Sequence, residues 1–189
     1  MGKALAPLEM SFEKKDAVKT GRFLLFFILV YLVLSFLSKA LFPPKVMETW
    51  IASNVLGMLS ILGQPGSVAI GETATINLAS GTAIEISELC TGAMETLVIA
   101  SAIISSIGIS WRKRAFGAVA SALIVVALNH FRIIVTTLLI LSTQDVEIVE
   151  FAHNTLFRLF LFISIAGLYV AWFYWAAGTE AKKARPNRH

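Results

Sequence analysis

Four long apolar stretches, each close to the length that crosses a lipid bilayer, constrain this chain more than any other feature. A helix rises 1.5 Å per residue, so about 20 apolar residues cover the hydrocarbon core. Only 15% of the residues are charged and 57% are hydrophobic, which excludes an ordinary soluble globular domain. We expect transmembrane helices at 23–42, 90–110, 116–142 and 153–177.

Basic residues predict the side of the membrane for each connecting segment, because cytoplasmic loops are enriched in Lys and Arg. Twelve of the 16 basic residues lie in the segment 1–22, the turn 112–114 and the tail 178–189. Seven of the 12 acidic residues lie in 48–88 and 145–150. We therefore expect a multi-pass protein of the cell membrane, with both termini in the cytoplasm and the acidic segments outside.

A cleaved signal peptide is the alternative interpretation of the first apolar stretch, because Ser-Lys-Ala at 38–40 loosely resembles a cleavage site. That stretch is longer than the roughly 7 to 15 apolar residues of a cleaved signal. The residues before it also include Glu9, Glu13 and Asp16. The sequence therefore favours a retained membrane anchor.

The segment 46–63 has apolar residues at helical spacing, with Glu48 and other polar residues between them. This pattern predicts an amphipathic helix lying at the outer membrane interface. A fifth transmembrane helix is the alternative, and it would place the basic turn 112–114 outside the cell.

Between residues 66 and 86 the apolar period changes to two, which predicts short strands joined by turns at 71–72 and 80–81. Open strands cannot face lipid, because their backbone groups would lack hydrogen-bond partners. The strands are therefore expected in the outer aqueous layer or against protein. The predicted fold is a single all-α polytopic membrane domain over 1–189, with four or five transmembrane helices and a small extracytoplasmic β element.

Ionisable residues inside the apolar stretches indicate either buried pairing or chemistry, because a charge at the bilayer centre costs about 2.5–3.5 kcal/mol on insertion scales. Glu95 lies just inside the second stretch, and Asn129 and Arg132 lie on one face of the third. Arg132 is about 15 Å from the outer end of its helix. A structural pair of Arg132 with Glu95 is the simplest interpretation of these residues taken alone.

Cys90 is the single cysteine, so neither an internal disulfide nor a thiolate metal cluster is available. A buried inert thiol is the ordinary interpretation of such a residue. Its predicted place in the first turn of a helix would instead favour the thiolate, as would the cation of Arg132. Glu88 opposes this effect, and Gly92 leaves room for the backbone of a substrate.

His153 is expected at the same outer level, at the start of the fourth stretch. A lone histidine at this position is often a surface or capping residue. Near a thiol it could act as a general base and later as an acid toward a departing amine. Cys90, Arg132 and His153 come from three different helices, and the expected topology places all three in the outer half of the membrane.

Cys90-Thr91-Gly92, the run Asn-His-Phe-Arg-Ile at 129–133 and His153 resemble, in order and membrane placement, the exosortase/archaeosortase family of prokaryotic membrane transpeptidases. The resemblance covers about 85–159. It implies that Cys90 is the nucleophile, that Arg132 stabilises charge, and that His153 fills the third catalytic position, for which Arg158 is the alternative. Substrate contacts are then expected at Glu88, Gly92, Asn129 and Arg158.

The resemblance also implies a reaction. The substrates would be exported proteins that end in a sorting signal, an apolar helix and a basic tail. A thioacyl intermediate would pass to an amine, such as one on a membrane lipid, or to water.

A non-enzymatic scaffold or transporter subunit with a buried Arg/Glu/His network is the alternative function. No cofactor, metal or nucleic-acid partner is expected, because the three histidines fit no ligand spacing and the basic residues follow membrane topology.

Overall fold

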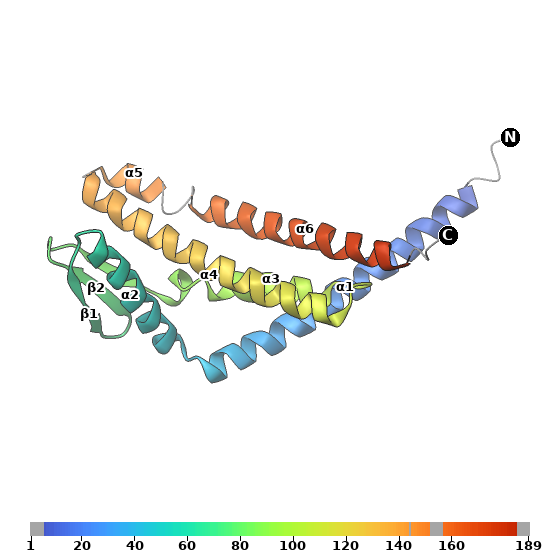
Figure 1. Ribbon diagram of the computed structural model, residues 1–189, viewed down its shortest axis with the longest axis horizontal. Coiled ribbons are helices and arrows are strands. Elements are labelled where there is room, and N and C mark those ends of the chain that lie inside the picture. The colour runs from blue at the N-terminus through green and yellow to red at the C-terminus, as the bar shows by residue number, and fades with distance from the viewer. Residues whose placement is uncertain (1–5, 144, 152–156, 185–189) are drawn as a thin grey trace.

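The computed structural model describes the backbone of residues 6–143, 145–151 and 157–184. It is an elongated bundle of helices with a small sheet at one end (Figure 1). The elements in chain order are α1 (Ala6–Leu41), α2 (Pro44–Ile61), β1 (Gly66–Ile70), β2 (Ala74–Leu78), β3 (Ala83–Ile86), the 3₁₀ turn η1 (Glu88–Cys90), α3 (Ala93–Ser105), α4 (Trp111–Ser142), α5 (Val146–Phe151) and α6 (Phe157–Ala184).

Three of the described helices are long and apolar enough to cross a membrane: Ala17–Leu41 within α1, the whole of α4, and Leu159–Thr179 within α6. The prediction of four such helices is therefore corrected to three. The segment expected to span at 90–110 forms only the 13 residues of α3, which is about 20 Å long. The segment 46–63, predicted as an amphipathic helix or a fifth span, falls largely within α2, which is not among the three; its amphipathic role at the interface remains a prediction.

The α3 helix ends early because its backbone turns, and a cation from the next helix caps one carbonyl of its last turn and one in the loop that follows. Ser106 is extended and Gly108 adopts a left-handed φ of 84°. Arg114 donates from Nε to the carbonyl of Ile109 at 2.9 Å and from Nη1 to that of Ile104 at 3.0 Å. Part of the basic turn is therefore a structural cap.

The predicted β element is confirmed as an antiparallel sheet in the order β1-β2-β3. Ala74, Ile76 and Leu78 alternate along β2 and are buried. They pack against the face of α2 that carries Ile51 and Val55. The sheet thus lies against protein, and its placement relative to the membrane remains a prediction.

The first residues of α1 and the last residues of α6 lie at one end of the molecule, and the sheet and α5 lie at the opposite end (Figure 1). The α4 helix runs from the end with the termini toward the sheet, and α6 runs back. The segments rich in basic residues therefore approach the same end, which agrees with the charge pattern of the sequence.

Close packing of α4 on α6 depends on Gly117. The Trp172 ring lies where a Cβ on Gly117 would be, and its Nε1 donates to the carbonyl of Lys113 at 3.2 Å. Trp172 is only 8% exposed, so the ring has little space to withdraw.

We expect Gly117→Ala to lower the stability of the purified protein by about 1–3 kcal/mol, because it overpacks this contact. The measurement is the thermal unfolding midpoint in detergent. Gly167→Ala on α6 is the matched control, since a Cβ there meets nothing within 4 Å. Equal midpoints for the two variants would contradict the role of Gly117.

Candidate active site

Cys90 ends the short turn η1 and lies three residues before Ala93, the first residue of α3. The prediction that it occupies the first turn of the helix is therefore wrong by a few residues. Cys90 is half-buried and packs against the core formed by α2 and the sheet. Its Sγ accepts a hydrogen bond from Ser87 Oγ at 3.6 Å. The sulfur is thus held at the junction between the sheet and α3.

The junction turns sharply at Gly92, which has φ 71° and serves as the N-cap of α3. This left-handed conformation favours glycine. The turn leaves the carbonyl of Cys90 outside the regular hydrogen bonds of α3. Asn129 of α4 satisfies it, with its Nδ2 donating to that carbonyl at 2.8 Å.

Asn129 is fully buried in the middle of α4. Its side chain lies so close to Gly92 that a Cβ there would be 2.9 Å from Asn129 Cγ. The Oδ1 of Asn129 is buried, and no described residue donates a hydrogen bond to it. An unpaired buried acceptor costs about 1–3 kcal/mol, so this atom is a candidate for contact with a ligand.

Arg132 lies one turn beyond Asn129 and is 7% exposed. It lines a cavity of about 440 Å³ between α3, α4 and α6, together with Glu95 of α3. The other lining residues are apolar: Met94, Val98, Leu161, Phe162, Ile165 and Ala166.

No ion pair joins Arg132 to Glu95, although the structure describes both side chains. The simple interhelical pair expected from the sequence is therefore absent. The guanidinium of Arg132 has no hydrogen bond to a described residue, and it lines the cavity as a buried cation.

The third catalytic position is not placed. His153 lies outside the described residues, and of Arg158 only the backbone within α6 is described. Leu161 and Phe162 of α6 line the same cavity as Arg132. The N-terminal part of α6 therefore reaches the cavity that contains the guanidinium.

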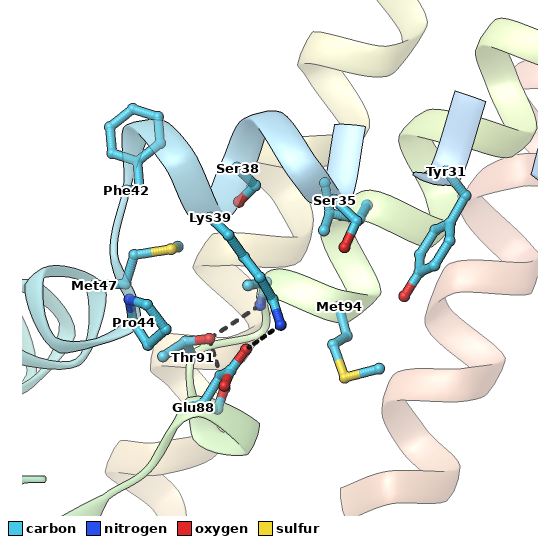
Figure 2. Close-up of a pocket in the computed structure, with 12 residues that line it drawn as sticks. Tyr31, Ser35, Ser38, Lys39, Phe42, Pro44, Met47, Glu88, Thr91 and Met94 are labelled. Carbon is cyan, nitrogen blue, oxygen red and sulfur yellow. Dashed lines mark hydrogen bonds and ion pairs between the residues drawn. The ribbon is translucent and has the colours of Figure 1, made fainter. Parts of the chain in front are cut away.

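Glu88 forms an ion pair with Lys39 of α1, with 3.7 Å between Oε1 and Nζ (Figure 2). The pair borders a small cavity of about 90 Å³ between α1 and the turn that carries Thr91. Because Lys39 faces Glu88, the acidic charge beside the thiol is partly balanced, which the sequence analysis did not anticipate.

Three hydroxyl-bearing residues of α1, Tyr31, Ser35 and Ser38, follow one side of the helix and line this same cavity (Figure 2). Their spacing of four and three residues was the available signal in the sequence. They give an otherwise apolar helix one polar face toward the turn after Cys90.

Two further polar residues are buried, although the sequence placed Glu48 on the polar side of its helix and assigned no role to His130. Glu48 is 5% exposed on the core face of α2. His130 is 6% exposed, and its Nδ1 lies 2.8 Å from the carbonyl oxygen of Val126. Its ring packs edge-on against Trp50, with 5.5 Å between the ring centroids. His130 therefore faces α2. Among the described residues, no group of three His, Cys, Asp or Glu side chains could hold a metal ion.

The profile of the transmembrane exosortase family matches residues 9–177, which is most of the 189-residue chain. The chain belongs to the transmembrane exosortase family. Searches among curated proteins and among solved structures gave no significant match. The match in this exosortase extends well beyond 85–159, the part that carries the short motifs, and includes α1, α2 and the sheet.

We expect Gly92→Ala to destabilise this exosortase more than Gly81→Ala does. Both glycines have positive φ, 71° and 87°, so both variants carry the strain of a left-handed alanine. Only at Gly92 does the added Cβ meet the Asn129 side chain, because nothing lies within 4 Å at Gly81.

The measurement is again thermal unfolding. The free energies of unfolding of the two variants should differ by about 1–3 kcal/mol, with the lower midpoint for Gly92→Ala. A Gly92→Ala midpoint equal to or above that of Gly81→Ala would show that Asn129 does not pack on the turn.

Proposed function

We propose that the protein is a membrane cysteine transpeptidase that cleaves a C-terminal sorting signal of exported proteins and transfers the new C-terminus to an amine. One observation supports it most: the hydrogen bond from Asn129 fixes the Cys90 turn to α4, one helical turn from the buried cation of Arg132. Family membership supplies the reaction class.

The first step is attack of the Cys90 thiolate on a peptide carbonyl carbon. A carbon–sulfur bond forms, and the carbonyl oxygen gains negative charge. Arg132 stabilises that charge or the preceding thiolate, since a fixed cation in a site with little water interacts strongly with developing charge. The cavity that Arg132 lines is mostly apolar, which limits the water around the guanidinium.

The second step breaks the carbon–nitrogen bond. His153 donates to the departing amine the proton that the Cys90 thiol gave up, and Cys90 keeps the acyl group as a thioester. An arginine does not give up its proton, so Arg158 in this position would stabilise charge while water protonates the amine. An acceptor amine then attacks the thioester carbonyl and gives a proton to the neutral His153. The carbon–sulfur bond breaks, the thiolate is released and the protein is left attached to the acceptor through an amide. A lipid amine would anchor the product to the membrane, whereas water would make the enzyme a protease.

The substrate approaches from within the membrane, with its apolar helix beside the transmembrane helices and its basic tail in the cytoplasm. Its cleavage motif then lies at the level of Cys90, outside the cell. Glu88 and Gly92 lie next to Cys90 and are the proposed substrate contacts, together with Asn129 and Arg158. The polar face of α1 borders the same turn.

This topology predicts that a membrane-impermeant maleimide, added to intact cells, labels Cys90. The intact mass reports the label directly, because the chain has one cysteine. The control is Arg112→Cys in a Cys90→Ala background, which places the only thiol in the basic turn. It should react only after permeabilisation. Labelling of the control variant but not of Cys90 in intact cells would show that the protein has the opposite orientation.

The catalytic roles predict that Cys90→Ala abolishes cleavage of a co-expressed, tagged exported protein that ends in an apolar helix and a basic tail. Arg132→Gln should lower the rate by about 100- to 1000-fold, as expected for loss of charge stabilisation in the transition state. Arg112→Gln is the control, because Arg112 is exposed at the other end of α4. This variant should cleave at the wild-type rate. The readout is the truncated product by mass spectrometry. Wild-type cleavage by Cys90→Ala would refute the proposal.

A further inference from the structure

The amide of Asn129 has two hydrogen-bonding atoms, and only the nitrogen, which faces the nucleophile turn, has a partner in the described part of the chain. Its Nδ2 donates to the Cys90 carbonyl at 2.8 Å, which joins residues 39 positions apart in the sequence. Its Oδ1 has no donor among the described residues and is shielded from solvent. A buried amide that is half satisfied commonly marks a place where a further group binds.

The geometry of the turn limits which group could reach this oxygen. Gly92 presents a bare Cα to the Asn129 side chain, with an ideal Cβ position 3.0 Å from Asn129 Cβ and 2.9 Å from Cγ. Because residue 92 is a glycine, its backbone can lie this close to the Asn129 side chain, and no side chain at that position blocks the approach of a ligand. An extended peptide lying on the turn would bring backbone N–H groups, which are obligatory donors.

We propose that Asn129 is the positioning residue of the nucleophile turn: its N–H fixes the Cys90 carbonyl, and its Oδ1 accepts a backbone N–H of the substrate peptide. This inference rests on the proposed transpeptidase function. The same side chain then sets the direction of the thiol and the register of the peptide that it attacks.

Two substitutions separate the two hydrogen bonds. Asn129→Leu keeps a similar volume and removes both. Asn129→Asp keeps an acceptor at Oδ1 and, as the carboxylate, has no donor for the Cys90 carbonyl. Thr137→Val is the matched control, because Thr137 is equally buried on α4 and its hydroxyl bonds only the Ile133 carbonyl of its own helix.

The assay is cleavage of the tagged exported protein in reconstituted vesicles, with kcat and KM determined separately. Both Asn129 variants should lower kcat by about 10- to 100-fold, since small misplacements of a reacting group have effects of this size. Asn129→Leu should also raise KM about 3- to 10-fold through loss of one hydrogen bond. Asn129→Asp and Thr137→Val should keep the wild-type KM.

Wild-type kcat in Asn129→Leu would overturn the proposal while leaving the transpeptidase function intact, provided that cleavage still requires Cys90. An equal rise of KM in the Leu and Asp variants would overturn the contact between Oδ1 and the substrate. Cleavage without Cys90 would overturn the function and the inference together. Should Asn129→Leu fail to accumulate, Asn129→Ala takes its place, with the same fall in kcat and rise in KM expected.

Discussion

The hydrogen bond between the Asn129 amide and the Cys90 carbonyl is the contact on which the arrangement of the site depends. Between η1 and α3 the backbone leaves its regular hydrogen bonding, and a carbonyl without a partner there would be costly. A side chain from the middle of α4 supplies the partner. The Cys90 turn and the start of α3 are thereby held against α4, one helical turn from Arg132.

The buried face of α4 contributes both to helix packing and to the candidate site. Its first half presents Gly117, Ala118 and Ser121, which allow neighbouring helices to approach closely. Its second half presents Asn129 and Arg132, which are polar and equally buried. Small residues therefore bring α3 and α6 close to α4, and the polar residues lie in the part of the bundle that this packing protects from lipid.

Periodicity in the sequence predicted the elements that local patterns determine. The change to a period of two gave the three strands, and the helical spacing after Val46 gave α2. The length of α3 was wrong, because Ile107 and Ile109 continue the apolar run although Gly108 turns the chain. Hydropathy sums cannot detect one left-handed glycine, nor the capping of α3 by Arg114.

The short motifs indicated Cys90, Asn129 and Arg132, but not the bond that joins Asn129 to the Cys90 turn. The bond from Asn129 to the Cys90 carbonyl and the pair between Lys39 and Glu88 each join residues about 40 to 50 positions apart. Such contacts depend on how helices pack, which a single sequence does not encode locally. The absence of an ion pair between Glu95 and Arg132 is likewise a property of the packed bundle.

The most direct test of the central claim is mass spectrometry of the enzyme trapped during turnover, with the adduct mapped to a residue. A thioester on Cys90 is expected, carrying a substrate fragment whose C-terminus marks the bond that was cut. Adding an amine should release that fragment and regenerate the free thiol. An unmodified Cys90 throughout substrate processing, or an acyl group on any other residue, would contradict the account.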